Sequence, residues 1–86
     1  MRNPTISFPP SALDALANSL NGLTGYVVSV ETVYPGAESV GEIVSVYYPP
    51  TGEWLVELAE FDDETGVDFY NTFTIRVDEI QTVTVR

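Results

Sequence analysis

The sequence predicts a mainly β protein (α+β by content), in which one N-terminal helix precedes a five-stranded, strongly bent antiparallel sheet that closes into a small barrel. Two observations predict this class. Leucines repeat at helical spacing near the N-terminus, and from residue 26 onward β-branched and aromatic residues form short runs separated by turn residues. Because 86 residues bury their apolar side chains in one core, we expect a single domain: lead-in 1–10, helix 11–22 and barrel 26–85.

The helix is predicted to begin at Ser11, whose hydroxyl suits an N-cap. Asp14 then lies near the N-terminus, where the helix dipole favours an acid. Asn21-Gly22 ends the helix, with Gly22 able to take the left-handed conformation. The apolar stripe of this helix, at intervals of three, four and three residues, comprises Leu13, Leu16, Leu20 and Leu23.

Five strands are predicted over residues 26–33, 42–48, 54–61, 69–77 and 81–85, with a single turn at Asp78-Glu79 before the last one. The fourth strand alternates and places one set of side chains inward, namely Phe69, Phe73, Ile75 and Val77. Val83 and Val85 point inward from the last strand.

Side-chain parity selects the turn of the central hairpin. A four-residue loop over 49–52 pairs Tyr48 with Glu53, whereas a type I turn with Gly52 in the left-handed bulge position pairs Tyr48 with Trp54. The second arrangement gathers one apolar face of Val44, Val46, Tyr48, Trp54, Val56 and Leu58, so we predict the bulged hairpin.

The opposite face of this hairpin is neither polar nor apolar throughout. It holds Ile43, Ser45, Tyr47, Glu53, Leu55 and Glu57. Its apolar members require partial cover, either by the leucine stripe of the helix or by another chain. We expect the helix to provide it, because its stripe also needs burial.

This pattern resembles the SH3-like barrels, including the KOW and Tudor-type domains. The resemblance covers about residues 26–85 and is carried by segments 39–46, 54–61 and 73–80. It implies a scaffold often used for protein–protein contact. The basic residues with which KOW-type domains contact RNA are missing, and in size and charge the chain resembles small acidic inhibitors encoded by phages.

Acidic residues are concentrated in the middle of the chain. The formal net charge is −10, from three arginines and 13 acidic residues. Residues 38–68 hold nine acidic and no basic residues, so this segment alone carries −9. Lysine is absent, which argues against direct nucleic-acid binding and against an anionic membrane surface. No apolar run approaches a membrane span, so we expect a cytoplasmic protein.

The missing residue types exclude several chemistries. Without histidine and cysteine there is no Ser-His-Asp triad, thiolate nucleophile or zinc ribbon. The acidic run 62–68 does not match a calcium loop, because from Asp62 its glycine falls at the fifth position instead of the sixth. We therefore expect no enzyme activity, no catalytic residue, no cofactor and no metal site.

Two main function classes remain open. The first is a protein-binding module that engages a basic partner through the acidic 38–68 segment. The second is an inhibitor that imitates nucleic acid and occupies the basic groove of a nucleic-acid-binding enzyme, as in anti-defence proteins of phages. A structural, homo-oligomeric subunit is a third reading. The candidate partner-binding residues are Tyr47, Glu53, Leu55, Glu57, Glu60, Asp62, Asp63, Glu64, Asp68 and Tyr70.

Overall fold

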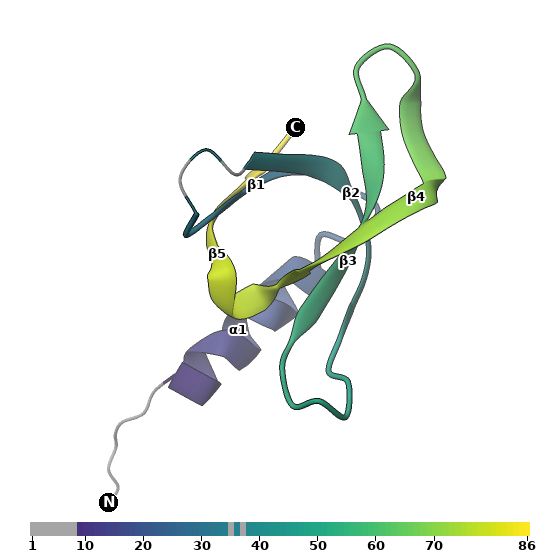
Figure 1. The fold of residues 1–86 in the computed structure, drawn as a ribbon. Coiled ribbons are helices and arrows are strands. Elements are labelled where there is room, and N and C mark those ends of the chain that lie inside the picture. The colour runs from purple at the N-terminus through teal and green to yellow at the C-terminus, as the bar shows by residue number, and fades with distance from the viewer. Residues whose placement is uncertain (1–8, 35, 37) are drawn as a thin grey trace, which may run out of the picture.

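A computed structural model describes residues 9–34, 36 and 38–86 of the chain. It confirms one helix followed by a five-stranded antiparallel sheet (Figure 1). The elements are α1 (Pro9–Asn21), β1 (Val27–Thr32), β2 (Glu38–Tyr47), β3 (Leu55–Asp62), β4 (Gly66–Arg76), the one-turn 3-10 helix η1 (Val77–Glu79) and β5 (Ile80–Val85). The single turn before the last strand is therefore confirmed as η1. No helix of the described residues has the length and apolarity needed to cross a membrane.

The sheet is strongly bent and remains open. Its strand order is β4-β3-β2-β1-β5, so β4 and β5 are its two edges. The expected barrel closure is wrong, because the β3–β4 hairpin projects away from the rest of the sheet and carries much of β4 out of reach of β5 (Figure 1).

The helix begins two residues earlier than predicted and ends at Asn21, as predicted. It begins at Pro9, since proline is tolerated in the first turn, so Ser11 is helical and is not the N-cap. The described part of the predicted lead-in is therefore helical, and residues 1–8 lie outside the described residues. At the other end the left-handed glycine is Gly25, with φ of 92°, and not Gly22.

The core lies between α1 and the concave face of the sheet. The leucine stripe is buried as predicted, but against the Val56 and Leu58 face of the hairpin, with Leu20 fully buried and Ala17 beside it. Strand side chains meet this stripe in one apolar cluster, whose fully buried members from the sheet and η1 are Val28, Val30, Ile43, Val56, Leu58 and Val77. Burial of this face holds the helix on the sheet.

The predicted bulged turn between β2 and β3 is confirmed. The Gly52 amide donates to the Pro49 carbonyl at 3.0 Å, and Gly52 has φ of 88°. The rings of Tyr48 and Trp54 consequently pack edge to face across the hairpin, with centroids 5.0 Å apart. Trp54 packs partly buried against the core as expected, whereas Tyr48 stays exposed at the rim.

A β-bulge in β2 reverses part of the predicted face. The pairing with β3 shifts between Ile43 and Ser45, and the extra residue is Val44. Ile43 therefore points into the core opposite Leu58, while Val44 is exposed, contrary to the prediction from strict alternation. The helix covers this concave face, so Tyr47 and Leu55 on the convex face lack the helix cover that we expected for them.

A larger bulge interrupts β4. Ala59 pairs with Thr72, but its neighbour Glu60 pairs with Asp68, so residues 69–71 have no partner in β3. Phe69, predicted to point inward, is instead 58% exposed, because it belongs to this bulge. Among the other residues predicted to point inward, Phe73, Ile75 and Val83 pack against the core, whereas Val85 is largely exposed.

Candidate functional site, an acidic groove

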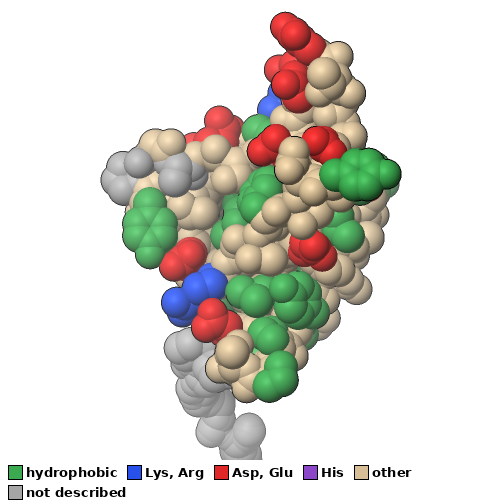
Figure 2. Space-filling model, turned by 45° about the vertical axis from the view of Figure 1, so that its right-hand side comes forward, with side chains coloured by type: hydrophobic (Ala, Val, Ile, Leu, Met, Phe, Trp, Pro, Cys, Tyr) green, Lys and Arg blue, Asp and Glu red, His purple; other side chains and the backbone are tan. Residues whose placement is uncertain are grey.

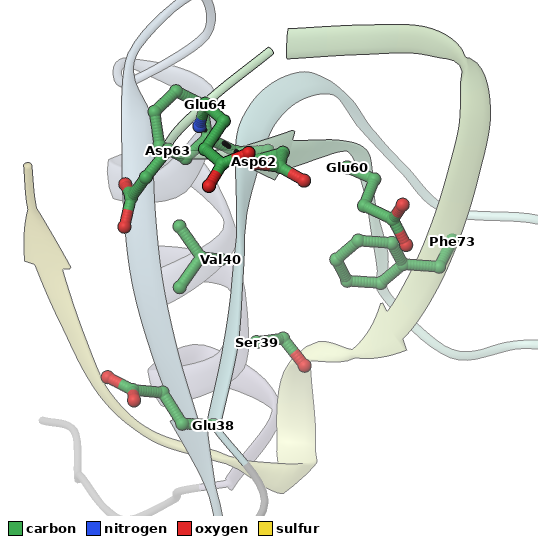
Figure 3. Close-up of a pocket in the computed structure, with 9 residues that line it drawn as sticks. Glu38, Ser39, Val40, Glu60, Asp62, Asp63, Glu64 and Phe73 are labelled. Atoms are coloured by element: carbon green, nitrogen blue, oxygen red, sulfur yellow. Dashed lines mark hydrogen bonds between the residues drawn. The ribbon is translucent and has the colours of Figure 1, made fainter. Parts of the chain in front are cut away.

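An open groove of about 870 Å³ lies between the first part of β2 and the far end of the β3–β4 hairpin (Figure 3). Five of its nine lining residues are acidic. We call it the acidic groove; its lining residues are Glu38, Ser39, Val40, Glu60, Phe61, Asp62, Asp63, Glu64 and Phe73.

A tight turn concentrates three of these carboxylates at the hairpin tip. Asp62 pairs with Gly66, whose φ of 84° favours glycine, so only residues 63–65 connect the strands. The Glu64 amide donates to Asp62 Oδ1 at 2.7 Å, which fixes the first turn residues. Consecutive acids that a longer loop would spread apart are therefore held close together beside the groove (Figure 3).

The opposite wall comes from the start of β2. Glu38 lines the groove there and accepts a hydrogen bond from the Ser29 hydroxyl of β1, which holds this carboxylate. Val40 lies between Glu38 and the hairpin tip, while Glu60 and Phe73 lie side by side across the opening (Figure 3). Val40, Phe73 and Phe61 give the acidic groove an apolar lining between its carboxylates.

The acidic groove is poorly neutralised. Within the described chain, Arg86 is the basic residue that contacts it, with Nη2 at 3.6 Å from Asp63 Oδ1. The carboxylates of Glu38, Glu60, Asp62 and Glu64 form no ion pair with a described arginine. Figure 2 shows acidic side chains gathered at the projecting hairpin tip. Like charges that converge on a partly apolar groove raise the local concentration of cations.

The other end of β3 is electrostatically different. Arg76 Nε lies 3.3 Å from Glu53 Oε2, and Arg76 Nη2 donates to Asp78 Oδ2 at 2.8 Å. The hydrogen bond to Asp78, its negative charge and that of Glu53 raise the pKa of Arg76. The Trp54 indole N–H donates to Asp14 Oδ1 at 2.7 Å and ties the helix to the hairpin. A smaller hollow of about 340 Å³ lies among these paired groups.

The structure therefore divides the predicted partner-binding residues. Glu60, Asp62, Asp63 and Glu64 come together in the acidic groove. Glu53 lies at the opposite end of β3 in its pair with Arg76.

The remaining predicted residues lie outside the acidic groove. Glu57 accepts a hydrogen bond from Ser45 at 3.3 Å, and Tyr47 and Leu55 lie near it on the convex face. Tyr70 belongs to the β4 bulge, and Asp68 directly precedes the bulge, where it accepts hydrogen bonds from the Tyr70 amide at 3.0 Å and from Asn71 Nδ2 at 2.8 Å. Tyr70 is 99% exposed.

Four residues that line the acidic groove are absent from the predicted partner-binding set: Glu38, Val40, Phe61 and Phe73. Glu38 belongs to the acidic 38–68 segment, but Glu38 and Val40 both precede the strand predicted over 42–48. Phe61 and Phe73 fall inside predicted strands. An earlier start of β2 would have placed Glu38 and Val40 beside the hairpin, since antiparallel pairing brings Gly41 opposite Glu60.

The described residues contain no group of three or more acidic side chains arranged to hold a metal ion. The carboxylates surround an opening and do not converge on one point. Such an arrangement suits extended or multiply charged cationic groups better than a single ion.

Comparison with known proteins adds no relative. No family model, no curated protein and no solved structure matches the chain.

Proposed function

We propose that this protein is a non-enzymatic binding module that engages the basic surface of a partner protein through the acidic groove. The observation that carries the proposal is the convergence of five carboxylates on one partly apolar groove, with one arginine of the described residues in contact. Complementary charge steers a basic partner to such a surface and aligns it there.

The apolar lining supports a protein partner. Lysine and arginine have long aliphatic stems that pack on apolar side chains while their charged ends reach carboxylates. Val40, Phe61 and Phe73 provide such a surface between the acids. Nearby, the bulge presents Phe69 and Tyr70, which are 58% and 99% exposed, and exposed aromatic residues are frequent anchors of protein interfaces.

The gathering of the carboxylates around one groove favours a protein-binding module over an inhibitor that imitates nucleic acid. A mimic needs carboxylates that follow a groove over several phosphate spacings, whereas a binding module needs one compact patch with aromatic anchors. The mimic remains the alternative proposal, and displacement of the protein from its partner by duplex DNA would support it.

We also propose that the sheet is an open variant of the SH3-like barrels. Support comes from the five antiparallel strands and the single 3-10 turn that precedes the last one. In this scaffold the β3–β4 hairpin, whose tip lines the acidic groove, projects from the sheet (Figure 1).

The test compares two pairs of neutral substitutions with the same net charge. The groove pair, Glu60→Gln with Glu64→Gln, removes two carboxylates of the acidic groove. The control pair, Glu53→Gln with Glu57→Gln, removes two predicted partner-binding carboxylates that lie outside the groove. Titration calorimetry with synthetic octa-arginine at low salt should show about tenfold weaker binding for the groove pair, because two charge contacts are lost. The control pair should change affinity by less than about threefold. Equal losses in both variants would mean that net charge, and not the groove, binds the peptide.

A further inference from the structure

Arg86 is held in a defined place beside the acidic groove. Its backbone N–H donates to the Val27 carbonyl at 2.9 Å, which continues the pairing of β5 with β1. Its guanidinium lies 3.6 Å from Asp63 and 6.0 Å from the centroid of the Phe61 ring. The hairpin tip therefore binds a guanidinium group supplied by a distant part of the same chain.

Phe61 and Asp63 also line the acidic groove. Their contact with Arg86 is an observation separate from the acidity of the groove, since it shows that these two side chains accept a guanidinium group. A planar guanidinium stacks on an aromatic ring and reaches a carboxylate at the same time, whereas an ammonium is a compact, strongly hydrated charge. The pair thus has the chemistry of an arginine subsite.

We propose that the acidic groove recognises arginine in particular, and that Arg86 occupies the Phe61–Asp63 subsite until an arginine of the partner displaces it. This rests on the proposed function and adds to it the residue type that is recognised and a competitor built into the chain. The partner is an arginine-rich segment of another protein.

The contacts of Arg86 are weak enough for exchange. Its distance to Asp63 exceeds that of a good hydrogen bond, and the Asp63 side chain is 80% exposed. A partner segment with several arginines would contact Glu60 and Glu64 as well as Asp63, whereas Arg86 forms an ion pair with Asp63 only. Replacement of Arg86 by the partner segment therefore forms more ion pairs with the groove than it breaks.

The experiment measures the affinity of octa-arginine and octa-lysine for Arg86→Gln and for a control, Arg76→Gln. Both variants lose one positive charge, so the formal net charge of each changes from −10 to −11. Arg76 is paired with Glu53 and Asp78 at the other end of β3, so its loss changes the net charge but not the subsite. Arg86→Gln should bind octa-arginine about fivefold more tightly, as expected when a competing exposed ion pair and cation–π contact are removed. Arg76→Gln should bind less than about twofold more tightly.

A second pair of variants tests the preference for arginine. Phe61→Leu should bind octa-arginine and octa-lysine alike, while Phe61→Tyr keeps the ring and should retain the preference. Thermal unfolding establishes that both variants are folded.

The outcomes separate the two proposals. Equal effects of Arg86→Gln and Arg76→Gln would overturn the competition, and equal binding of both peptides by the unmodified protein would overturn the arginine preference. In either case, a loss of octa-arginine affinity in the groove pair Glu60→Gln/Glu64→Gln that the control pair does not show would still support the proposed function. Absence of binding of both peptides to the unmodified protein would overturn both proposals.

Discussion

The two ends of β3 are both acidic, yet they differ in what surrounds the acids. At the end near Leu55, Glu53 and Asp78 contact the same arginine, Arg76, so one of their two negative charges is offset. At the end near Asp62, five carboxylates surround the acidic groove, and among the described arginines Arg86 contacts one of them. The first end is paired internally, and the second is left available.

Strand register produces this difference. Arg76 is opposite Leu55 in the β3–β4 pairing, which places its guanidinium beside the β2–β3 turn and far from the hairpin tip. The density of acids along the sequence is highest in 60–64, but it is the position of the arginines in the sheet that decides which acids remain unpaired. Availability of charge is therefore a property of the fold.

The largest expected effect tests the bulge that lies between the two ends. Ile43→Ala should lower the free energy of unfolding by about 3 kcal/mol, because it leaves a cavity beside Leu58 in the core. Val44→Ala, one residue along, should cost less than about 1 kcal/mol, since Val44 is exposed on the bulge. Urea unfolding measures both. The reverse order would mean that β2 alternates regularly and that the groove wall formed by its first residues is placed differently.

The next effect concerns the internally paired end. Asp14→Ala removes the acceptor of the Trp54 indole N–H and should destabilise the protein by about 1 kcal/mol. Trp54→Phe removes the donor, so the double variant should show a coupling of similar size in a double-mutant cycle.

Octa-arginine binding serves as the readout that compares the ends. It should remain within about twofold of the unmodified protein in Asp14→Ala, because Asp14 does not line the acidic groove. A loss of binding as large as that of the groove pair would show that the two ends are not independent.

Sequence reasoning predicted the elements well because their signals are local. The leucine stripe, the turn at 49–52 and the short strands depend on residues close together in the chain, and the Tyr48–Trp54 contact followed from parity at one turn. Parity also gave the wrong face for Ile43, because a bulge adds one residue without any mark in the sequence that sets Val44 apart.

The candidate site was only half predictable for the same reason. Four of its acids lie in one run, 60–64, and were selected from charge density. Glu38 and Phe73 join them through long-range pairing of β2, β3 and β4, which the sequence does not specify residue by residue. The three-residue bulge that exposes Phe69 and Tyr70 depends equally on a register shift between Ala59 and Glu60.

A smaller effect sharpens the electrostatic side of the comparison. Glu64→Gln should raise the free energy of unfolding by about 0.5 kcal/mol, because it relieves repulsion among carboxylates that have no described cation partner. Glu53→Gln should lower it by a similar amount, because it removes an ion pair with Arg76. Both differences should shrink in 1 M salt, where the Debye length is about 3 Å. Equal signs for the two substitutions at low salt would contradict the division into a paired and an available end.

The smallest effect comes from Tyr34, whose partner Glu79 directly follows Asp78 of the paired end. Its phenol O–H donates to Glu79 Oε2 at 3.0 Å, and this hydrogen bond, followed by the negative charge of Glu79, raises the pKa of Tyr34. The folded protein thus favours the protonated phenol, so the link stabilises the fold below the ordinary tyrosine range, about pH 10, and is lost as pH rises through the folded pKa.

Tyrosinate absorbance against pH, with Tyr34→Phe subtracted, should place the midpoint of Tyr34 above that of N-acetyltyrosinamide. Glu79→Gln should move it down, because the acceptor charge is gone. A midpoint unchanged by Glu79→Gln would mean that the phenol and the carboxylate are apart in solution. Since Glu79 and Tyr34 do not line the acidic groove, octa-arginine affinity should be the same before and after this substitution, which separates the titration of one end from the binding at the other.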